Sequence, residues 1–246
     1  MSASIFSGKI AVADYSTTVD YASRQFTRLG NSSVLTLNVN EENKELLDYQ
    51  DAAGGLAASY RRIQTVTGQI DMRDITAANL ALALWGTTAA KGTTAITGEA
   101  HKIYAGAFVP TDRLINTTIA PVVKKGATTV STADYTVSKS GILIASTITT
   151  GGVTSGDAIT IDYTPAAGND VQALINSAPL KSLHFEGVNQ VDGKYVKLRI
   201  WEIKLGAPKN ISMIGDDFAT LSLEFSVIKD PTIVVGSPYF DMEQES

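Results

Sequence analysis

The chain has 246 residues, a formal net charge of −5 and no cysteine. This length allows a large buried core, and the lack of cysteine excludes disulfides and thiolate metal ligands. The acidic balance argues against a protein that binds nucleic acid by neutralising phosphates. Charged residues make up only 18% of the chain, while Thr, Ser, Val, Ile and Gly recur throughout. This composition favours strands and turns over long helices.

The first 33 residues are polar and irregular in pattern, which predicts an N-terminal arm over 1–33 that docks on another surface. This segment lacks a basic region followed by a long apolar run. No stretch of the chain reaches the roughly 18 consecutive apolar residues of a membrane span. We therefore expect a protein that folds in a cytoplasm and has no membrane partner.

The first clear strand spans 34–40 and alternates apolar with polar residues, so one face is expected to be buried. The acidic segment EENKELLDYQDAAGGLAAS follows and is predicted to be a long polar loop. Loops longer than about 12 to 15 residues usually carry a function or are disordered. A calcium site is disfavoured here, because the acids lack the spacing and the glycine of a calcium loop.

Residues 60–73 again alternate as a strand does, and Gly68 within them predicts a bulge. The one clear helix is predicted to follow over 74–86, with Asp74 as its N-terminal cap and Gly86 at its end. The residues predicted to pack this helix against the core are Ile75, Ala78, Leu82 and Trp85.

Short strands separated by turns predict an inserted all-β subdomain over 110–167. Its turns include Ser140-Gly141 and the low-complexity run STITTGGVTSGD. The main sheet is expected to resume near 183–188 and to turn at Asp192-Gly193.

Two long strands close the predicted core. The first, KYVKLRIWEIKL, alternates up to Ile200 and then slips by one position at Trp201, which predicts a bulge or a sharp twist. The second, LSLEFSV, alternates without a break and has one apolar and one polar face. The patterns together predict a mainly β fold, a β-sandwich or half-barrel with one flanking helix. Its core would comprise 34–109 and 168–232, followed by a C-terminal tail over 233–246.

Signals for catalysis are weak. The two histidines, His101 and His184, each lie beside a strand and away from any metal-ligand spacing. The neighbouring acids Asp216 and Asp217 favour a turn or a helix cap over a catalytic pair. The sequence holds no glycine-rich phosphate loop, nucleophile elbow or HExxH helix. We therefore expect neither enzyme activity nor a cofactor.

The order of these parts resembles that of the tail tube proteins of tailed bacteriophages, in particular those with long non-contractile tails. The resemblance covers about 34–109 and 170–232. It is carried by LTLNVN with its acidic loop, by RRIQTVTGQIDMRDITAANLALALWG, and by LHFEGVN, KYVKLRIWEIKLGAP and ISMIGDDFATLSLEFSVIKDP. The run DYTVSKSGILIASTITTGGVTSGDAITIDYT is similar to an element of some of these proteins.

The resemblance implies a structural virion protein rather than an enzyme. Six copies would close into a ring whose inner sheets join into one large barrel, and rings would stack into the tail tube that guides DNA during ejection. Assembly would take place in the cytoplasm of the host bacterium. The implied partners are further copies of the chain, the tape measure protein, the tail terminator and the baseplate or tip proteins. Double-stranded DNA would pass through without specific binding.

Two sets of residues follow as candidate sites. The candidate lumen-facing residues are Thr36, Asn38, Thr67, Asp71, Ser222 and Glu224. The candidate residues of an inter-ring loop are Glu41, Glu42, Glu45, Leu46, Leu47, Asp48, Tyr49 and Asp51. An alternative stays open, a surface module that binds a receptor or a carbohydrate through 110–167. That alternative needs an exposed aromatic platform.

Overall fold

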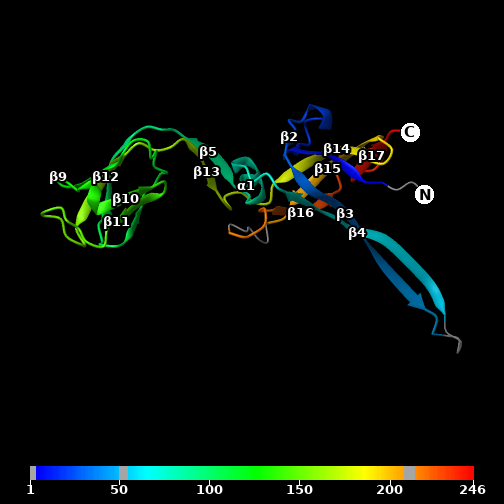
Figure 1. Ribbon diagram of the computed structural model, residues 1–246. Coiled ribbons are helices and arrows are strands. Elements are labelled where there is room, and N and C mark those ends of the chain that lie inside the picture. The colour runs from blue at the N-terminus through cyan, green and yellow to red at the C-terminus, as the bar shows by residue number, and fades with distance from the viewer. Residues whose placement is uncertain (1–3, 50–54, 208–213) are drawn as a thin grey trace. The chain divides into compact units, whose positions relative to one another are not determined.

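A computed structural model describes residues 4–49, 55–207 and 214–246 (Figure 1). The chain divides into two compact units, unit 1 with residues 1–88 and 171–246 and unit 2 with residues 89–170. Antiparallel strands dominate both units, and each has its own apolar core. The prediction of a mainly β fold is confirmed. Within one chain the described strands form open sheets and no closed barrel.

Unit 1 is built on one eight-stranded sheet (Figure 1). The strand order is β2-β1-β14-β15-β16-β4-β3, and β17 pairs with β15. In chain order these strands are β1 (Phe6–Asp14), β2 (Thr27–Arg28), β3 (Ser32–Leu47), β4 (Leu56–Met72), β14 (Leu180–Asn189), β15 (Tyr195–Leu205), β16 (Leu221–Ile228) and β17 (Phe240–Gln244).

Strand β15 divides this sheet into two layers. Its first half, up to Ile200, pairs with β17, and from Glu202 onward the same edge pairs with β16. On its other edge the register with β14 shifts at this same point. The bulge predicted from the phase slip at Trp201 is therefore confirmed. We call β1, β14, β17 and the first half of β15 layer A, and β3, β4, β16 and the second half of β15 layer B.

Both layers and the helix contribute apolar side chains to the core of unit 1. Burying each large apolar side chain contributes about 1.5–3 kcal/mol. Phe225 lies over Gly68, where a Cβ atom would come within 2.3 Å of the ring. Strand β4 keeps its register with both neighbours at Gly68. The bulge predicted at this glycine is wrong, because the glycine makes room for an aromatic ring instead.

The helix α1 spans Ala77–Ala83 and is shorter than the predicted helix over 74–86. Its N-terminal cap is Thr76, while the predicted cap, Asp74, accepts a hydrogen bond from the backbone of Asn31. The helix ends early because Trp85 takes a left-handed φ of 51°.

The buried face of α1 is rotated by one position from the predicted stripe. Asn79 is buried, and its amide donates to the carbonyls of Leu29 and Asp74. These two hydrogen bonds fix the rotation of the helix. Leu82 packs against the core as predicted, but Ile75 and Ala78 are exposed. The predicted stripe is wrong for both exposed residues, because a pattern of apolar residues alone does not include the buried polar Asn79.

Both terminal segments contribute strands where an arm and a tail were predicted. Strand β1 lies within 1–33 and pairs with β14 over nine residues. Strand β17 lies within 233–246 and pairs with β15. Ile10 and Phe240 pack against the core, so a few apolar residues hold segments whose average composition is polar.

The segment between β1 and β2, which includes the 3-10 helix η1 (Tyr21–Ser23), covers the part of the outer face of layer A around Ser182 and His184. Arg24 fastens it by donating hydrogen bonds to the Ser182 hydroxyl at 2.5 Å and to the Trp201 carbonyl at 3.1 Å. Its guanidinium also lies 4.9 Å from the ring centre of Tyr15, a cation–π contact.

Unit 2 holds the sheets β6-β12-β8-β9 and β10-β11-β7. Strands β5 and β13 pair with each other, and each includes residues of both units. The strands are β5 (Thr87–Lys91), β6 (Ile96–Lys102), β7 (Phe108–Pro110), β8 (Val122–Lys125), β9 (Thr128–Thr129), β10 (Tyr135–Ser138), β11 (Gly141–Ile144), β12 (Ala158–Tyr163) and β13 (Gly168–Gln172). The predicted insertion over 110–167 is too short at its start. Strands β6 and β7 pair with β12 and β11, so residues 89–109 belong to this unit.

A buried carboxylate organises the low-complexity run of unit 2. Asp134, at the end of the 3-10 helix η2 (Thr132–Asp134), accepts hydrogen bonds from the backbone and the hydroxyl of both Thr149 and Thr150. These four hydrogen bonds hold the pKa of Asp134 well below its usual range. The threonines of this run therefore fix a loop.

Candidate assembly surface

The outer face of layer B is polar across four strands. Asn38, Thr67, Ser226 and Lys204 follow one another in register from β3 to β15. Since side chains alternate along a strand, they share the face opposite the core. The same pairing places all the predicted lumen candidates on this face, namely Thr36, Asn38, Thr67, Asp71, Ser222 and Glu224. That the face lines a lumen stays a prediction.

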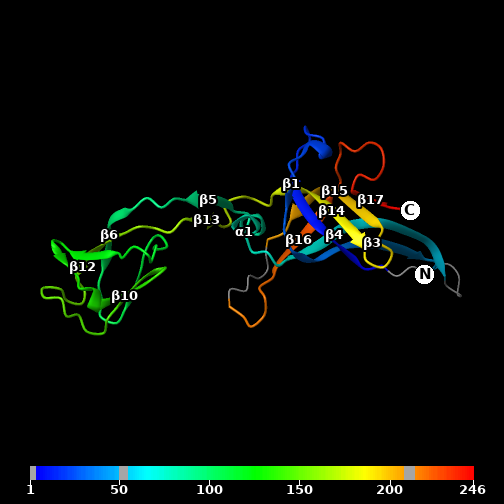
Figure 2. The ribbon, with the colours of Figure 1, turned by 45° about the horizontal axis from the view of Figure 1, so that its top comes forward.

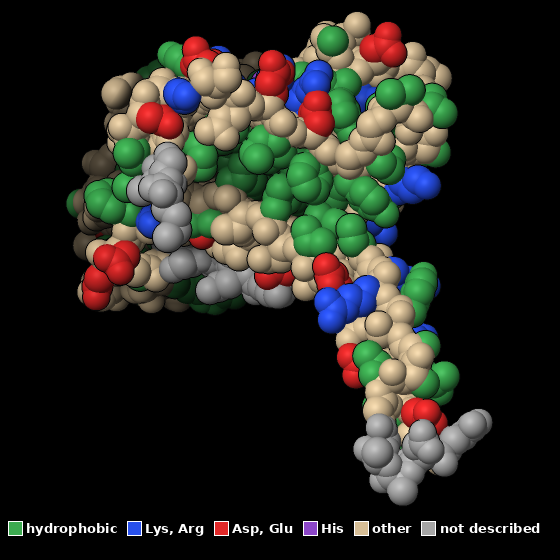
Figure 3. Space-filling model, turned by 90° about the vertical axis from the view of Figure 1, so that its right-hand side faces the viewer, with side chains coloured by type: hydrophobic (Ala, Val, Ile, Leu, Met, Phe, Trp, Pro, Cys, Tyr) green, Lys and Arg blue, Asp and Glu red, His purple; other side chains and the backbone are tan. Residues whose placement is uncertain are grey.

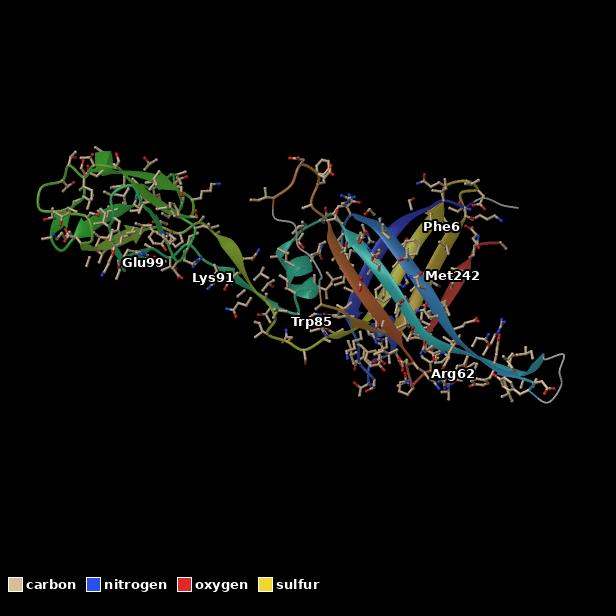
Figure 4. The ribbon with its side chains drawn as sticks, turned by 90° about the horizontal axis from the view of Figure 1, so that it is seen from below. Phe6, Arg62, Trp85, Lys91, Glu99 and Met242 are labelled. Atoms are coloured by element: carbon tan, nitrogen blue, oxygen red, sulfur yellow. The ribbon has the colours of Figure 1, made fainter. Side chains whose placement is uncertain are left out.

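Trp85 borders this polar face instead of packing in the core. It follows α1 and lines a groove of about 510 Å³ together with Gln69 and Lys204 (Figure 4). Its indole nitrogen is buried and has no hydrogen-bond partner among the described residues. The predicted core-packing role of Trp85 is wrong, because the left-handed turn at this residue carries the ring away from the helix stripe.

Strands β3 and β4 continue beyond the rest of layer B as a two-stranded ribbon (Figures 1 and 2). We call residues 41–49 and 55–63 the arm. Its pairing runs from Glu41 opposite Ile63 to Leu47 opposite Leu56. The predicted long loop is therefore wrong over its described part. Composition pointed to a loop, but contacts between the strands, such as the ion pair of Glu42 with Arg62 at 2.6 Å, stabilise a ribbon.

The predicted inter-ring residues lie on the arm as far as the structure describes it. Glu41, Glu42, Glu45, Leu46 and Leu47 belong to β3, and Asp48 and Tyr49 follow it directly. Asp51 lies outside the described residues.

The far part of the arm is apolar on both of its faces. Leu46 lies opposite Ala58 and Leu47 lies opposite Leu56, with a register shift between the two pairs. As consecutive residues of β3, Leu46 and Leu47 point to opposite faces. Leu46 is 61% exposed and Tyr49 is 84% exposed. An isolated two-stranded ribbon is at best marginally stable in water, and adjoining exposed apolar side chains mark interaction sites. The arm is therefore a candidate binding element.

Strand β3 also leaves one edge unpaired. It is the last strand in the sheet order, and across the described residues its second edge has no partner strand. A free edge of this kind exposes backbone donors and acceptors and pairs readily with a strand of another chain.

Several buried ionisable groups of the described residues contact one another. Glu202 lies at the β15 bulge with Tyr15 and Asp230, and burial raises the pKa of Glu202. In unit 2 the Nε2 atom of His101 lies 2.6 Å from a Glu99 carboxylate oxygen. The other oxygen of Glu99 accepts from Tyr163, and burial raises the pKa of that tyrosine to about 12.

The other candidates for chemistry lie apart from these groups. His184 lies on β14 beside Tyr21, and burial lowers its pKa. Asp216 and Asp217 lie exposed in an irregular segment, so the turn interpretation holds and the helix-cap interpretation is wrong. The part of the chain that the structure describes has no group of three or more acidic, histidine or cysteine side chains placed to hold a metal.

Comparison with known proteins identifies the family. The chain matches, over residues 3–243, the family described as protein of unknown function UCP028589. No curated protein matches the chain. Among the described residues no helix has the length and apolarity needed to cross a bilayer. Because the match spans nearly the whole chain, the protein belongs to the family of unknown function UCP028589.

Proposed function

We propose that this protein is a structural subunit that assembles with copies of itself into stacked rings and so forms the tail tube of a bacteriophage. The observation that carries the proposal is the polar face of layer B, backed by the core and bordered by the free edge of β3. A sheet that packs on a core and lines a water-filled channel needs one apolar and one polar face.

Ring closure would use the free strand edges. Pairing between the β3 edge of one copy and its neighbour would join the sheets into a barrel, and closure removes exposed edges. Four strands from each of six copies, the number that the resemblance implies, would make a barrel of about 24 strands. Barrels of about 16 to 18 strands already leave an aqueous channel.

The polar face suits passage of DNA without adhesion. Duplex DNA carries one negative charge per roughly 1.7 Å. On the polar face of layer B, the acidic side chains of Asp71 and Glu224 lie among neutral side chains. Lys204 lies in the row next to that of Glu224. The tape measure, terminator and baseplate or tip proteins are the proposed partners in the virion tail. The proposed role needs no cofactor, no catalysis and no membrane contact.

Electron microscopy of the purified protein in negative stain, across salt and protein concentrations, tests the proposal. We expect rings or tubes of constant diameter. The matched control replaces residues 43–61 with an Asn-Gly turn, so that the ribbon ends at the Glu42–Arg62 pair. This variant should remain folded and should not form tubes. A wild-type protein that stays monomeric under every condition would overturn the proposal.

A second candidate function is the binding of a receptor or carbohydrate by unit 2. Phe108 pairs with Leu143 on an exposed sheet face, and the two side chains are 47% and 49% exposed. The Phe108 ring also lies beside Gly141, where a Cβ atom would come within 2.9 Å of the ring. A glycan array probed with the full chain and with Phe108→Ala tests this role. Equal glycan-binding signals from the wild type and from Phe108→Ala would exclude a binding site at Phe108.

A further inference from the structure

The core of unit 1 is open to solvent at one end. Phe6 lies in β1 on the core side, and Met242 lies in β17 opposite the buried Leu198, yet they are 49% and 65% exposed. On layer B, Val39 lies opposite the buried Val66 and is also 49% exposed. We call Phe6, Val39 and Met242 the core mouth. Figure 4 places Phe6 and Met242 at the same end of the sheet.

Apolar side chains gather in a hollow on the face of unit 1 from which the arm projects (Figure 3). Among the described residues, Phe6, Val39 and Met242 stay uncovered on the core side at this end. A gap of this kind exposes two apolar layers at once, which is costly in water. It therefore requires an occupant that is apolar on both of its faces.

From these two surfaces we propose that the core mouth of one copy receives the end of the arm of a second copy. The inference rests on the proposed function and assigns the surface that the arm binds. Leu46 and Leu47 point to opposite faces of the ribbon, so a flat partner would cover only one of them. Insertion between two apolar layers covers both.

The occupant cannot be the arm of the same copy. The arm continues the pairing of β3 and β4, and it points away from the sheet in every ribbon view (Figures 1, 2 and 4). The contact therefore joins two copies of the chain.

Charged groups border both partners and would form the rim of the contact. Glu42 pairs with Arg62 at the base of the arm, and Lys197 pairs with Glu243, which follows Met242 and points to the opposite face of β17. An apolar centre with a polar rim is the usual organisation of a specific protein interface. The base of the arm, at Glu42 and Arg62, would therefore stay at the rim while Leu46, Leu47 and Tyr49 enter the mouth.

Site-directed disulfide formation tests the contact directly, because the chain has no cysteine of its own. Leu47→Cys in one copy is mixed with Met242→Cys in a size-tagged copy and oxidised mildly. We expect a disulfide-linked heterodimer at a yield at least about fivefold above that of Leu47→Cys mixed with Val235→Cys. Val235 is 91% exposed, so random collision would favour the control. Equal yields in the two mixtures would overturn the inference.

A second variant separates this inference from the proposed function. Met242→Glu should fold normally because the side chain is exposed, and it should need at least about tenfold more protein to assemble, since a charge would enter an apolar contact. Normal tubes from this variant would reject the mouth and leave the tube proposal standing. Heterodimers in the disulfide experiment, together with a wild-type protein that forms no tubes, would keep the contact between arm and mouth and reject the tube.

Discussion

Layers A and B share a strand, yet their outer faces differ. The chain covers part of the outer face of layer A with its own segment around Tyr21 and Arg24, and Ser182 beneath this segment is fully buried. The rest of that face carries the charged side chains of Glu186, Lys197 and Glu243. The outer face of layer B carries Asn38 and Glu224 exposed to solvent. The difference shows that the fold covers part of one outer face with its own chain and, among the described residues, leaves the other face open to solvent.

Removal of the cover over layer A should have the largest effect on stability. Arg24→Ala deletes the hydrogen bonds to Ser182, Trp201 and Ser16 and the contact with the Tyr15 ring. We expect a loss of about 2–4 kcal/mol of unfolding free energy, measured by denaturant titration.

The matched control for this variant is Arg28→Ala. Arg28 is exposed and lies 3.9 Å from the exposed Glu186, so its removal should cost less than about 0.5 kcal/mol. Similar losses from Arg24→Ala and Arg28→Ala would mean that the cover does not stabilise layer A.

The bulge shared by the two layers should respond to pH. Glu202 is buried and faces Tyr15, Asp230 and Arg24, and burial raises its pKa above the value of about 4.3 in an unfolded chain. The folded state therefore binds the proton more tightly. This contribution to stability is complete below about pH 4 and is lost as the pH rises through the folded pKa.

Glu202→Gln keeps the side chain neutral and should remove this dependence. We expect the variant to exceed the wild type by about 1 kcal/mol at pH 8 and to match it near pH 4, in thermal melts across pH. The exposed Glu41→Gln serves as control and should leave the profile unchanged. A parallel shift at both pH values would contradict a buried, titrating Glu202.

Substitution on the outer face of layer B should have the smallest effect on stability and a clear effect on function. Thr36→Lys combined with Ser222→Lys adds two positive charges to the polar face. We expect a change below about 0.5 kcal/mol in the monomer, because surface substitutions rarely exceed this value. Assembled tubes should now retain duplex DNA in a salt-dependent manner, measured by co-sedimentation. DNA retention equal to that of wild-type tubes would contradict the lumen assignment.

Sequence alone predicted the long strands and the bulge in β15, because alternation with period two is a local property of the chain. The same property placed Thr36, Asp71 and Ser222 on one face. It could not orient α1, where the amide of Asn79 bonds to carbonyls from distant or non-helical residues. The arm was also missed, since its pairing depends on contacts between segments separated in sequence by a polar run. The core mouth requires knowledge of which strand ends meet.

The strand β15 belongs to both layers, and this has a consequence for how the protein can vary. Its extra residue at Trp201 and Glu202 accompanies the change of partner from β17 to β16. Loss of one residue there would still leave every apolar side chain facing the core, but it would remove the irregularity that lets the strand turn between layers. The strand therefore tolerates substitution more readily than a change in length.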